Sequence, residues 1–397
     1  MAKKIKKTRK LLTIYFLAIV GGILIGVNLK STILPSIPFL TANKISEELS
    51  AKKLNEIAKE DSVFLVNVHS PYEGEIAGTD AFIAYDEMKA NVDKLPTDKN
   101  AQIVLYCKTG KMSAEALKTL KGMGYTNVSH LDGGMDAWER SKYEVLNLAD
   151  LPSKVLPEEG FELPITWGDL GPKMIAMGVI DKDKFIEATK PTDEEKKILI
   201  EGTDEKLKID TNKSRFVVNM LWAAGLAQRS VVYTEGPMGK EYKKDIGNFS
   251  STGGWNLARG LAVNHLGQHN LVDLSSDQEK RVAEIAKNVY RPCCGNSTYF
   301  PDCNHGMAAL FAIEAMVAQN LSDEEIYKNV LKLNSFWFPD TYLAVATYFA
   351  RQGQDWQSLD SKEALGANYS SSQGAQDIYT KVGDLPYEKK TGGSCGA

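Results

Sequence analysis

Cysteine and histidine are scarce in this sequence, with five of each among 397 residues. An odd number of cysteines at this low density excludes a small domain held together by disulfides. Hydrophobic residues make up 43% of the chain and charged residues 25%, which excludes a collagen-like or largely disordered protein. At roughly 150 residues per domain, the length predicts about two to three domains.

Positive charge is scarce outside the N-terminus. Residues 1–10 contain six Lys or Arg and no acidic residue, whereas residues 31–397 contain 40 basic and 51 acidic side chains, a net charge of −11. A body with this charge repels the phosphate backbone of nucleic acids. The sequence therefore predicts no nucleic-acid partner.

One long apolar run follows the basic cluster. Residues 11–27 are seventeen residues without a charge, at the lower end of the roughly 17–25 residues that cross a bilayer as a helix. The Lys and Arg residues before this run are expected to keep the N-terminus in the cytoplasm and to place the bulk of the chain outside. Residues 1–30 therefore predict a single-pass signal anchor in the cell membrane, followed by a linker over 31–45. A cleaved signal peptide and a buried globular helix are the alternatives.

Residues 46–147 alternate between two kinds of pattern. Short apolar runs predict strands at 63–68, 103–106 and 128–131. Periodic stretches predict helices at 46–59, 86–94 and 113–122. This alternation predicts an α/β domain with a parallel sheet and helices on both faces, whose active site lies at the carboxyl ends of the strands.

Cys107 directly follows the second predicted strand and opens the loop Cys107-Lys-Thr-Gly-Lys-Met-Ser113. A thiol on this tight loop precedes a helix N-terminus, and backbone N–H groups there stabilise an anion on sulfur. We predict that Cys107 is catalytic. The predicted substrate-binding residues are Lys108, Thr109, Gly110, Lys111, Met112, Ser113 and, from an earlier segment, His69. A buried cysteine that merely ends a strand is the alternative.

Three motifs occur in order along residues 46–147. The first is the Cys-x-x-Gly-x-x-Ser loop at 107–113, the second is Gly-Tyr-x-x-Val at 124–128, and the third is Leu-x-Gly-Gly-x-x-Ala-Trp at 131–138. In this order and spacing they resemble a single-domain rhodanese. The resemblance implies sulfurtransferase activity, in which Cys107 takes a sulfane sulfur as a persulfide and passes it to a nucleophile. It also implies two partners, a sulfane-sulfur donor such as thiosulfate and a thiol acceptor.

Two segments depart from the family pattern. The early Asp-x-Arg-x-Pro-x-Glu segment is Asn67-Val-His69-Ser-Pro71-Tyr-Glu73 in this chain, and Met112 occupies a position where the family often has Arg. His69 replaces the missing positive charge only when it is protonated, so an orienting hydrogen bond is its alternative role. The second interpretation of the chain is therefore an inert rhodanese module joined to a metal-binding or interaction domain.

Residues 155–385 predict a second domain that is mainly α-helical. Its expected helices are at 216–227, 278–290, 307–319, 323–335 and 341–351. The sequence indicates no family of known activity for this domain. A Gly-rich tail follows at 386–397, and its Cys395 is a candidate thiol shuttle between Cys107 and the other cysteines, with an accidental exposed cysteine as the alternative.

Cys293, Cys294 and Cys303 lie within eleven residues, and His305 follows them closely. Three thiols and an imidazole are a suitable ligand set for zinc or another soft metal. The spacing is not a standard zinc-finger pattern. A disulfide from Cys303 to Cys293 or Cys294 therefore stays open, as do three reduced, reactive thiols.

Overall fold

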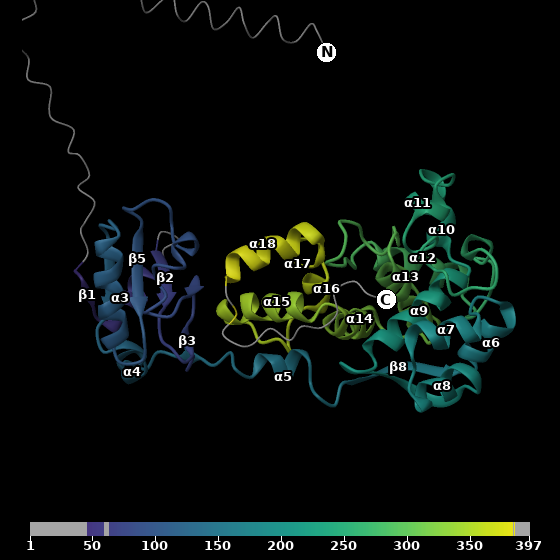
Figure 1. The fold of residues 1–397 in the computed structure, drawn as a ribbon, viewed down its shortest axis with the longest axis horizontal. Helices are drawn as coiled ribbons and strands as arrows, with labels where there is room; N and C mark the ends of the chain where they lie inside the picture. Colours follow the sequence, from purple (N-terminus) through teal and green to yellow (C-terminus); the bar gives the residue numbers. More distant parts are fainter. Residues whose placement is uncertain (1–45, 59–62, 384, 386–397) are drawn as a thin grey trace, which may run out of the picture. The chain divides into compact units, whose positions relative to one another are not determined.

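The computed structural model describes residues 46–58, 63–383 and 385 (Figure 1). The predicted anchor at 1–30, the linker at 31–45 and the tail with Cys395 lie outside these residues. Across the described part of the chain, no helix has the length and apolar character needed to cross a membrane.

The first module contains a five-stranded sheet with the strand order β1-β6-β5-β2-β4, in which every neighbouring pair is parallel. Its strands are β1 (Glu48–Leu49), β2 (Val63–Asn67), β4 (Ala81–Phe82), β5 (Gln102–Tyr106) and β6 (Val128–Leu131). A separate antiparallel pair consists of β3 (Glu75–Ile76) and β7 (Val145–Leu146). The parallel sheet is confirmed, with the three predicted strands appearing as β2, β5 and β6.

Helices cover both faces of this sheet. Successive side chains of a strand point to opposite faces, and β5 shows the result. Ile103 and Leu105 lie in the apolar core that includes α3 (Lys111–Gly122), whereas Val104 and Tyr106 lie in the core on the other face. That second core includes residues of α2 (Ala51–Ile57) and α4 (Gly134–Arg140). The two-sided cover predicted from the alternating pattern is confirmed.

Two expected helices of this module differ from the structure. The stretch at 46–59 begins as strand β1, and α2 starts only after Ser50, whose side chain accepts a hydrogen bond from the N–H of Lys53. The stretch at 86–94 forms turns and a short 3-10 helix, η1 (Val92–Lys94). Met88 is its one buried side chain. A single buried apolar residue provides too little packing to hold an α-helix.

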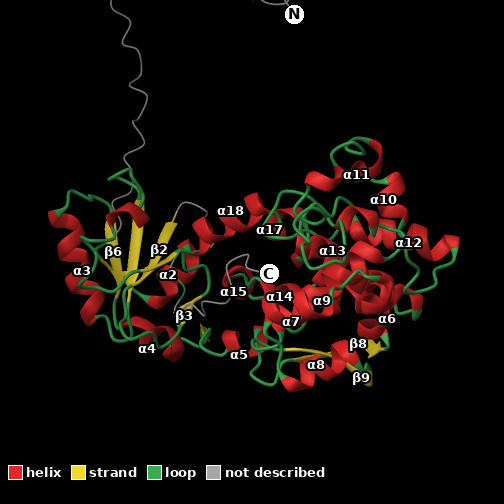
Figure 2. Ribbon diagram, turned by 45° about the vertical axis from the view of Figure 1, so that its right-hand side comes forward, coloured by secondary structure: helices red, strands yellow, loops and turns green. Residues whose placement is uncertain are grey.

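The region after residue 150 is mainly helical, as predicted (Figure 2). Its helices are α5 (Leu151–Val155), α6 (Leu170–Met177), α7 (Lys182–Thr189), α8 (Asp193–Ile200), α9 (Ser214–Ala227), α10 (Val231–Glu235), α11 (Pro237–Lys240), α12 (Ser276–Ala286), α13 (Asn304–Ala318), α14 (Asp323–Trp337), α15 (Pro339–Arg351), α16 (Ser361–Ala364), α17 (Ala367–Ser370) and α18 (Ser372–Val382). The sequence missed the antiparallel pair β8 (Phe161–Gly168) and β9 (Thr203–Ile209). In β9 only Leu207 and Ile209 are buried, so its alternating signal is too short to recognise.

Helices α9 and α13 form the centre of this helical region. Every residue of α13 from His305 to Val317 is buried, which is typical of a helix that is apolar on all sides. The two helices touch at Gly225, where a Cβ atom would lie 2.1 Å from the carbonyl oxygen of Met307. Cys303 is the N-cap of α13, so the same packing fixes the position of the cysteine cluster.

Candidate functional site

Cys107 lies at the carboxyl end of β5, in the loop that leads into α3. Its side chain is buried, and its Sγ accepts a hydrogen bond from the N–H of Gly110 at 3.1 Å. Gly110 has a left-handed φ of 87° and is the N-cap of α3, so the loop turns back over the sulfur atom. The chain therefore forms the tight loop before a helix that the sequence predicted.

A hydroxyl links the Cys107 thiol to a buried imidazole. The thiol donates to Ser113 Oγ at 3.7 Å, and the same Oγ lies 3.2 Å from Nδ1 of His130 on β6. Ser113 Oγ also donates to the carbonyl oxygen of Gly110 at 3.0 Å. Our sequence reasoning missed His130, whose only signal was its position in the strand before the Gly-Gly motif. The Ser113 hydroxyl therefore lies between the Cys107 thiol and the His130 imidazole.

The structure divides the remaining predicted loop residues into two groups. Met112 packs against the apolar core that contains Cys107. Thr109 and Lys111 are exposed on the outside of the loop. Of the predicted loop residues, Gly110 and Ser113 are therefore the ones that form hydrogen bonds with the Cys107 sulfur atom.

Lys108 is engaged by a carboxylate instead of facing the sulfur as an unpaired cation. Its Nζ lies 2.8 Å from Glu73 Oε2, and Nε2 of His69 lies 3.5 Å from the same oxygen. The hydrogen bond and charge of Lys108 lower the pKa of Glu73, and the same hydrogen bond raises the pKa of Lys108. Our sequence reasoning assigned no role to Glu73, whose carboxylate pairs with the basic residue next to Cys107.

Asn67 shapes the segment that holds His69. Its Oδ1 accepts the N–H of His69 at 3.0 Å, and its Nδ2 donates to the carbonyl oxygen of Gly74 at 2.9 Å. The His69 side chain is buried, and its Nδ1 has no hydrogen-bond partner among the described residues. The structure thus places His69 beside the loop through the Asn67 contacts and the Glu73 carboxylate.

A buried ion pair connects this segment to the helical region. Glu75 accepts hydrogen bonds from Nε of Arg351 at 2.6 Å and from Nη2 at 3.2 Å, and both side chains are buried. Arg351 Nη1 also donates to the carbonyl oxygen of Val382 at 2.7 Å. Burial raises the pKa of Glu75, and the Arg351 charge opposes this shift. Arg351 on α15 therefore holds the segment that carries His69 and Glu73.

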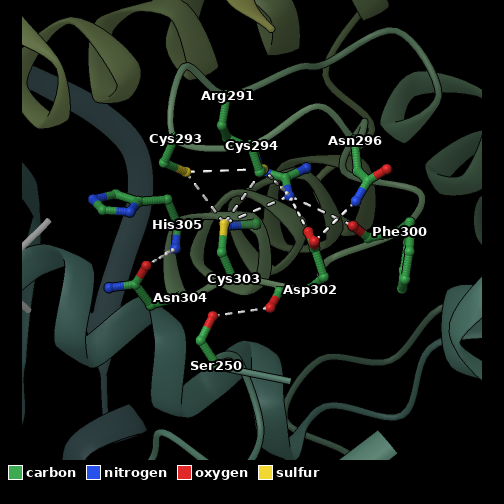
Figure 3. A network of polar contacts seen from close by, with 11 residues as sticks. Ser250, Arg291, Cys293, Cys294, Asn296, Phe300, Asp302, Cys303, Asn304 and His305 are labelled. Atoms are coloured by element: carbon green, nitrogen blue, oxygen red, sulfur yellow. Dashed lines mark hydrogen bonds and ion pairs between the residues drawn. The ribbon is translucent and has the colours of Figure 1, made fainter. Parts of the chain in front are cut away.

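A second group of chemically active residues precedes α13 (Figure 3). The sulfur atoms of Cys293 and Cys303 lie 3.4 Å apart, those of Cys294 and Cys303 lie 3.8 Å apart, and those of Cys293 and Cys294 lie 3.9 Å apart. A disulfide bond measures about 2.05 Å, so these three residues are present as thiols. Among the described residues, they form the one group of three or more His, Cys, Asp or Glu ligand atoms that is compact enough for a shared ion.

His305 does not complete this group, which corrects the predicted four-residue ligand set. Its ring packs against Trp337 and Phe338, and Figure 3 shows the imidazole pointing away from the sulfur atoms. Burial lowers the pKa of His305 to about 4. The physical reason is that α13 begins at Asn304, directly after its N-cap Cys303. Successive side chains of a helix point about 100° apart around its axis, so the His305 side chain is directed away from that of Cys303.

Arg291 is completely buried beside the three sulfur atoms. Its Nη2 donates to Cys294 Sγ at 3.0 Å and to Asp302 Oδ1 at 2.9 Å, and it lies 3.5 Å from Cys303 Sγ. Hydrogen bonds from Cys293 and Cys294, together with the Arg291 charge, lower the pKa of Cys303. The sequence analysis did not identify Arg291 as part of this cluster.

Comparison with protein families identifies residues 50–141 as a rhodanese-like domain. The resemblance predicted from the motifs is therefore confirmed for this part of the chain. The helical region that follows is assigned to no family by these comparisons.

The relatives of known sequence match the same part of the chain. An uncharacterized protein of Synechocystis is 30% identical over 110 residues, which cover 27% of this chain and 60% of that protein. The probable adenylyltransferase/sulfurtransferase MoeZ of Mycobacterium tuberculosis is 40% identical over 80 residues, or 19% of this chain and 20% of that protein. A tRNA uridine(34) hydroxylase of Erwinia tasmaniensis is 28% identical over 109 residues, which cover 26% of this chain and 31% of that protein. The chain thus spans 60% or less of these relatives.

Among solved structures, a rhodanese-related protein from Thermoplasma volcanium is 25% identical. The match covers 25% of this chain and 98% of that chain, with a TM-score of 0.23.

Proposed function

We propose that this chain is a membrane-anchored, extracytoplasmic sulfurtransferase that forms a persulfide on Cys107. The observation that carries the proposal is the 3.1 Å hydrogen bond from the Gly110 N–H to Cys107 Sγ, at the N-terminus of α3. A preorganised amide and a helix N-terminus stabilise negative charge on sulfur. A thiolate is the form that attacks another sulfur atom.

The proposed reaction has two displacement steps. The Cys107 thiolate attacks the outer sulfur of a donor such as thiosulfate, a new S–S bond forms, and sulfite leaves with the electron pair of the broken S–S bond. An acceptor thiolate then attacks the terminal sulfur of the persulfide, and Cys107 leaves as a thiolate. Lys108, half-exposed and paired with Glu73, is the basic loop residue that would bind an anionic donor.

Exposure of the reduced protein to thiosulfate should add one sulfur atom to Cys107, because the loop is already arranged to hold the anion. The peptide that contains Cys107 should gain the mass of one sulfur, and added thiol should reverse the gain. Cys107→Ser should abolish both this modification and thiocyanate formation with cyanide as the acceptor. Cys303→Ser is the matched control and should retain both. An unmodified Cys107 after exposure to several sulfane donors would sink the proposal.

The membrane anchor and the extracytoplasmic location are proposed from residues 1–30, in which six basic residues at positions 1–10 precede seventeen uncharged residues at positions 11–27. Protease added to intact cells or spheroplasts should therefore digest residues 46–397 and spare the N-terminus. Complete protection of the chain would reverse the proposed orientation. A mature N-terminus beyond residue 27, detected by mass spectrometry, would indicate a cleaved signal peptide instead.

The second candidate function is a non-enzymatic one, with an inert rhodanese module. It is favoured by the pairing of Lys108 with Glu73 and by Asn67 and His69, which stand where the family pattern has an acid and an arginine. The persulfide measurement separates the two functions. The net charge of −11 on residues 31–397 disfavours binding of an RNA substrate such as that of the tRNA hydroxylase relative.

A further inference from the structure

The sulfur atoms of Cys293, Cys294 and Cys303 form a nearly equilateral triangle with sides of 3.4, 3.8 and 3.9 Å. A circle through the three atoms has a radius of about 2.1 Å, just below the Zn–S bond length of about 2.3 Å. An ion bonded to all three would therefore sit slightly out of their plane, as it does in a tetrahedral site. The N–H of Cys294 donates to the carbonyl oxygen of Arg291 and closes a turn. This turn allows the sulfur atoms of both adjacent cysteines, Cys293 and Cys294, to lie next to Cys303 Sγ.

The surrounding loop and one neighbouring segment hold this triangle in place. Asp302 is central, because its carboxylate pairs with Arg291 at 2.9 Å and accepts from Asn296 Nδ2 at 2.8 Å. The backbone oxygen of Asp302 accepts from the Ser250 hydroxyl at 3.0 Å (Figure 3). Locked supporting residues of this kind orient the ligands of metal sites. The sulfur atoms are therefore preorganised.

Arg291 supplies positive charge to the triangle. Its Nε and Nη1 have no hydrogen-bond partner among the described residues, although the side chain is completely buried. Gly306 allows this close approach, since a Cβ atom there would lie 2.8 Å from Arg291 Nη2, and its N–H donates to Cys303 Sγ at 3.3 Å. Three thiolates and a divalent ion have a net charge of −1, whereas three thiolates and a monovalent ion have a net charge of −2. The single positive charge of the buried Arg291 guanidinium balances the divalent complex better.

The described residues provide no fourth ligand. His305 packs against aromatic rings, and both carboxylate oxygens of Asp302 are engaged by Arg291 and Asn296. The three cysteines are each only partly buried, so solvent reaches the cluster. Structural zinc sites have four protein ligands, whereas sites with three keep one position for water or a substrate.

We propose that Cys293, Cys294 and Cys303 bind one thiophilic divalent metal ion, such as Zn²⁺, through three thiolates. The fourth coordination position is not filled by the protein and takes water or a small thiol. Binding forms three metal–sulfur bonds and releases the thiol protons to solvent, without any change in oxidation state. The site does not depend on sulfur transfer at Cys107.

The test is a Co²⁺ titration of the reduced full-length chain, followed by displacement with Zn²⁺. One ion per chain should bind, with the thiolate-to-cobalt absorption that only sulfur ligands produce, and an added small thiol should change the spectrum. Cys303→Ser should weaken that absorption, because only two of the three thiolates remain, and should bind at least ten-fold more weakly. Cys107→Ser is the matched control and should bind as the wild type does.

A second measurement works without any substitution. Zn²⁺ should protect Cys293, Cys294 and Cys303 of the wild type from alkylation, and a chelator should remove the protection. The proposal is overturned if the reduced wild type binds neither ion, if Cys303→Ser binds Co²⁺ unchanged, or if His305→Phe removes the cobalt absorption from a folded chain. Because thiocyanate formation is measured separately, failure of this site leaves the function proposed for Cys107 untouched.

Discussion

Arg351→Ala is expected to lower the free energy of unfolding by about 3–5 kcal/mol at neutral pH, because it removes one partner of a buried ion pair. The Glu75 carboxylate would lose two hydrogen bonds, of 2.6 and 3.2 Å, and would remain as a buried charge without compensation. The carbonyl oxygen of Val382 would lose its donor as well. Urea-induced unfolding measures the loss.

The size of this loss should depend on pH. Burial already raises the pKa of Glu75, and removal of the guanidinium raises it further. A carboxyl group whose pKa is higher in the folded state contributes its full stability below the unfolded pKa, and that contribution disappears as the pH rises through the folded pKa. The Arg351→Ala variant should therefore approach wild-type stability at acidic pH and fall behind as the pH rises.

A second substitution provides the control. Glu75→Gln in the Arg351→Ala background removes the buried charge, so it should recover most of the lost stability at neutral pH. A loss that is the same at every pH, or one that Glu75→Gln does not reduce, would show that the guanidinium acts through packing and not through the carboxylate.

The Cys107 loop could be predicted from the sequence because its determinants are local. A buried strand ends at Tyr106, Gly110 adopts the left-handed conformation, and α3 follows within four residues of Cys107. The ion pair between Glu75 and Arg351 joins residues 276 positions apart. A contact at that separation leaves no local pattern.

The cysteine cluster shows the same division between local and non-local information. Cys293, Cys294 and Cys303 are close in sequence, so their meeting could be expected. The exclusion of His305 depends on where α13 begins and on the rings of Trp337 and Phe338, which belong to a different segment. Residue type and spacing alone do not reveal which way a side chain points at a helix start.

Gly134→Ala is expected to disturb the Cys107 loop more than any change on the loop's exposed side. Gly134 has a left-handed φ of 57°, and a Cβ atom there would lie 2.2 Å from the carbonyl oxygen of Cys107 and 2.4 Å from that of Lys108. The same two oxygens accept the N–H groups of Met135 and Asp136 at 2.9 and 3.0 Å, so α4 holds the loop through them. Strain and overlap together should cost about 2–4 kcal/mol of stability.

The same substitution should reduce sulfur transfer about 100-fold, because a displacement of about 1 Å at a reacting atom has an effect of this size. Thiocyanate formation gives kcat/KM, and the melting temperature shows whether the variant is folded under the assay conditions. Gly122→Ala, at the end of α3, is the matched control, since nothing outside its own stretch of helix lies within 4 Å of its Cβ position. That control should transfer sulfur as the wild type does. If Gly134→Ala also turns over at the wild-type rate, the carbonyl groups of Cys107 and Lys108 do not set the geometry of the reacting sulfur, and preorganisation of the loop is not the source of the activity.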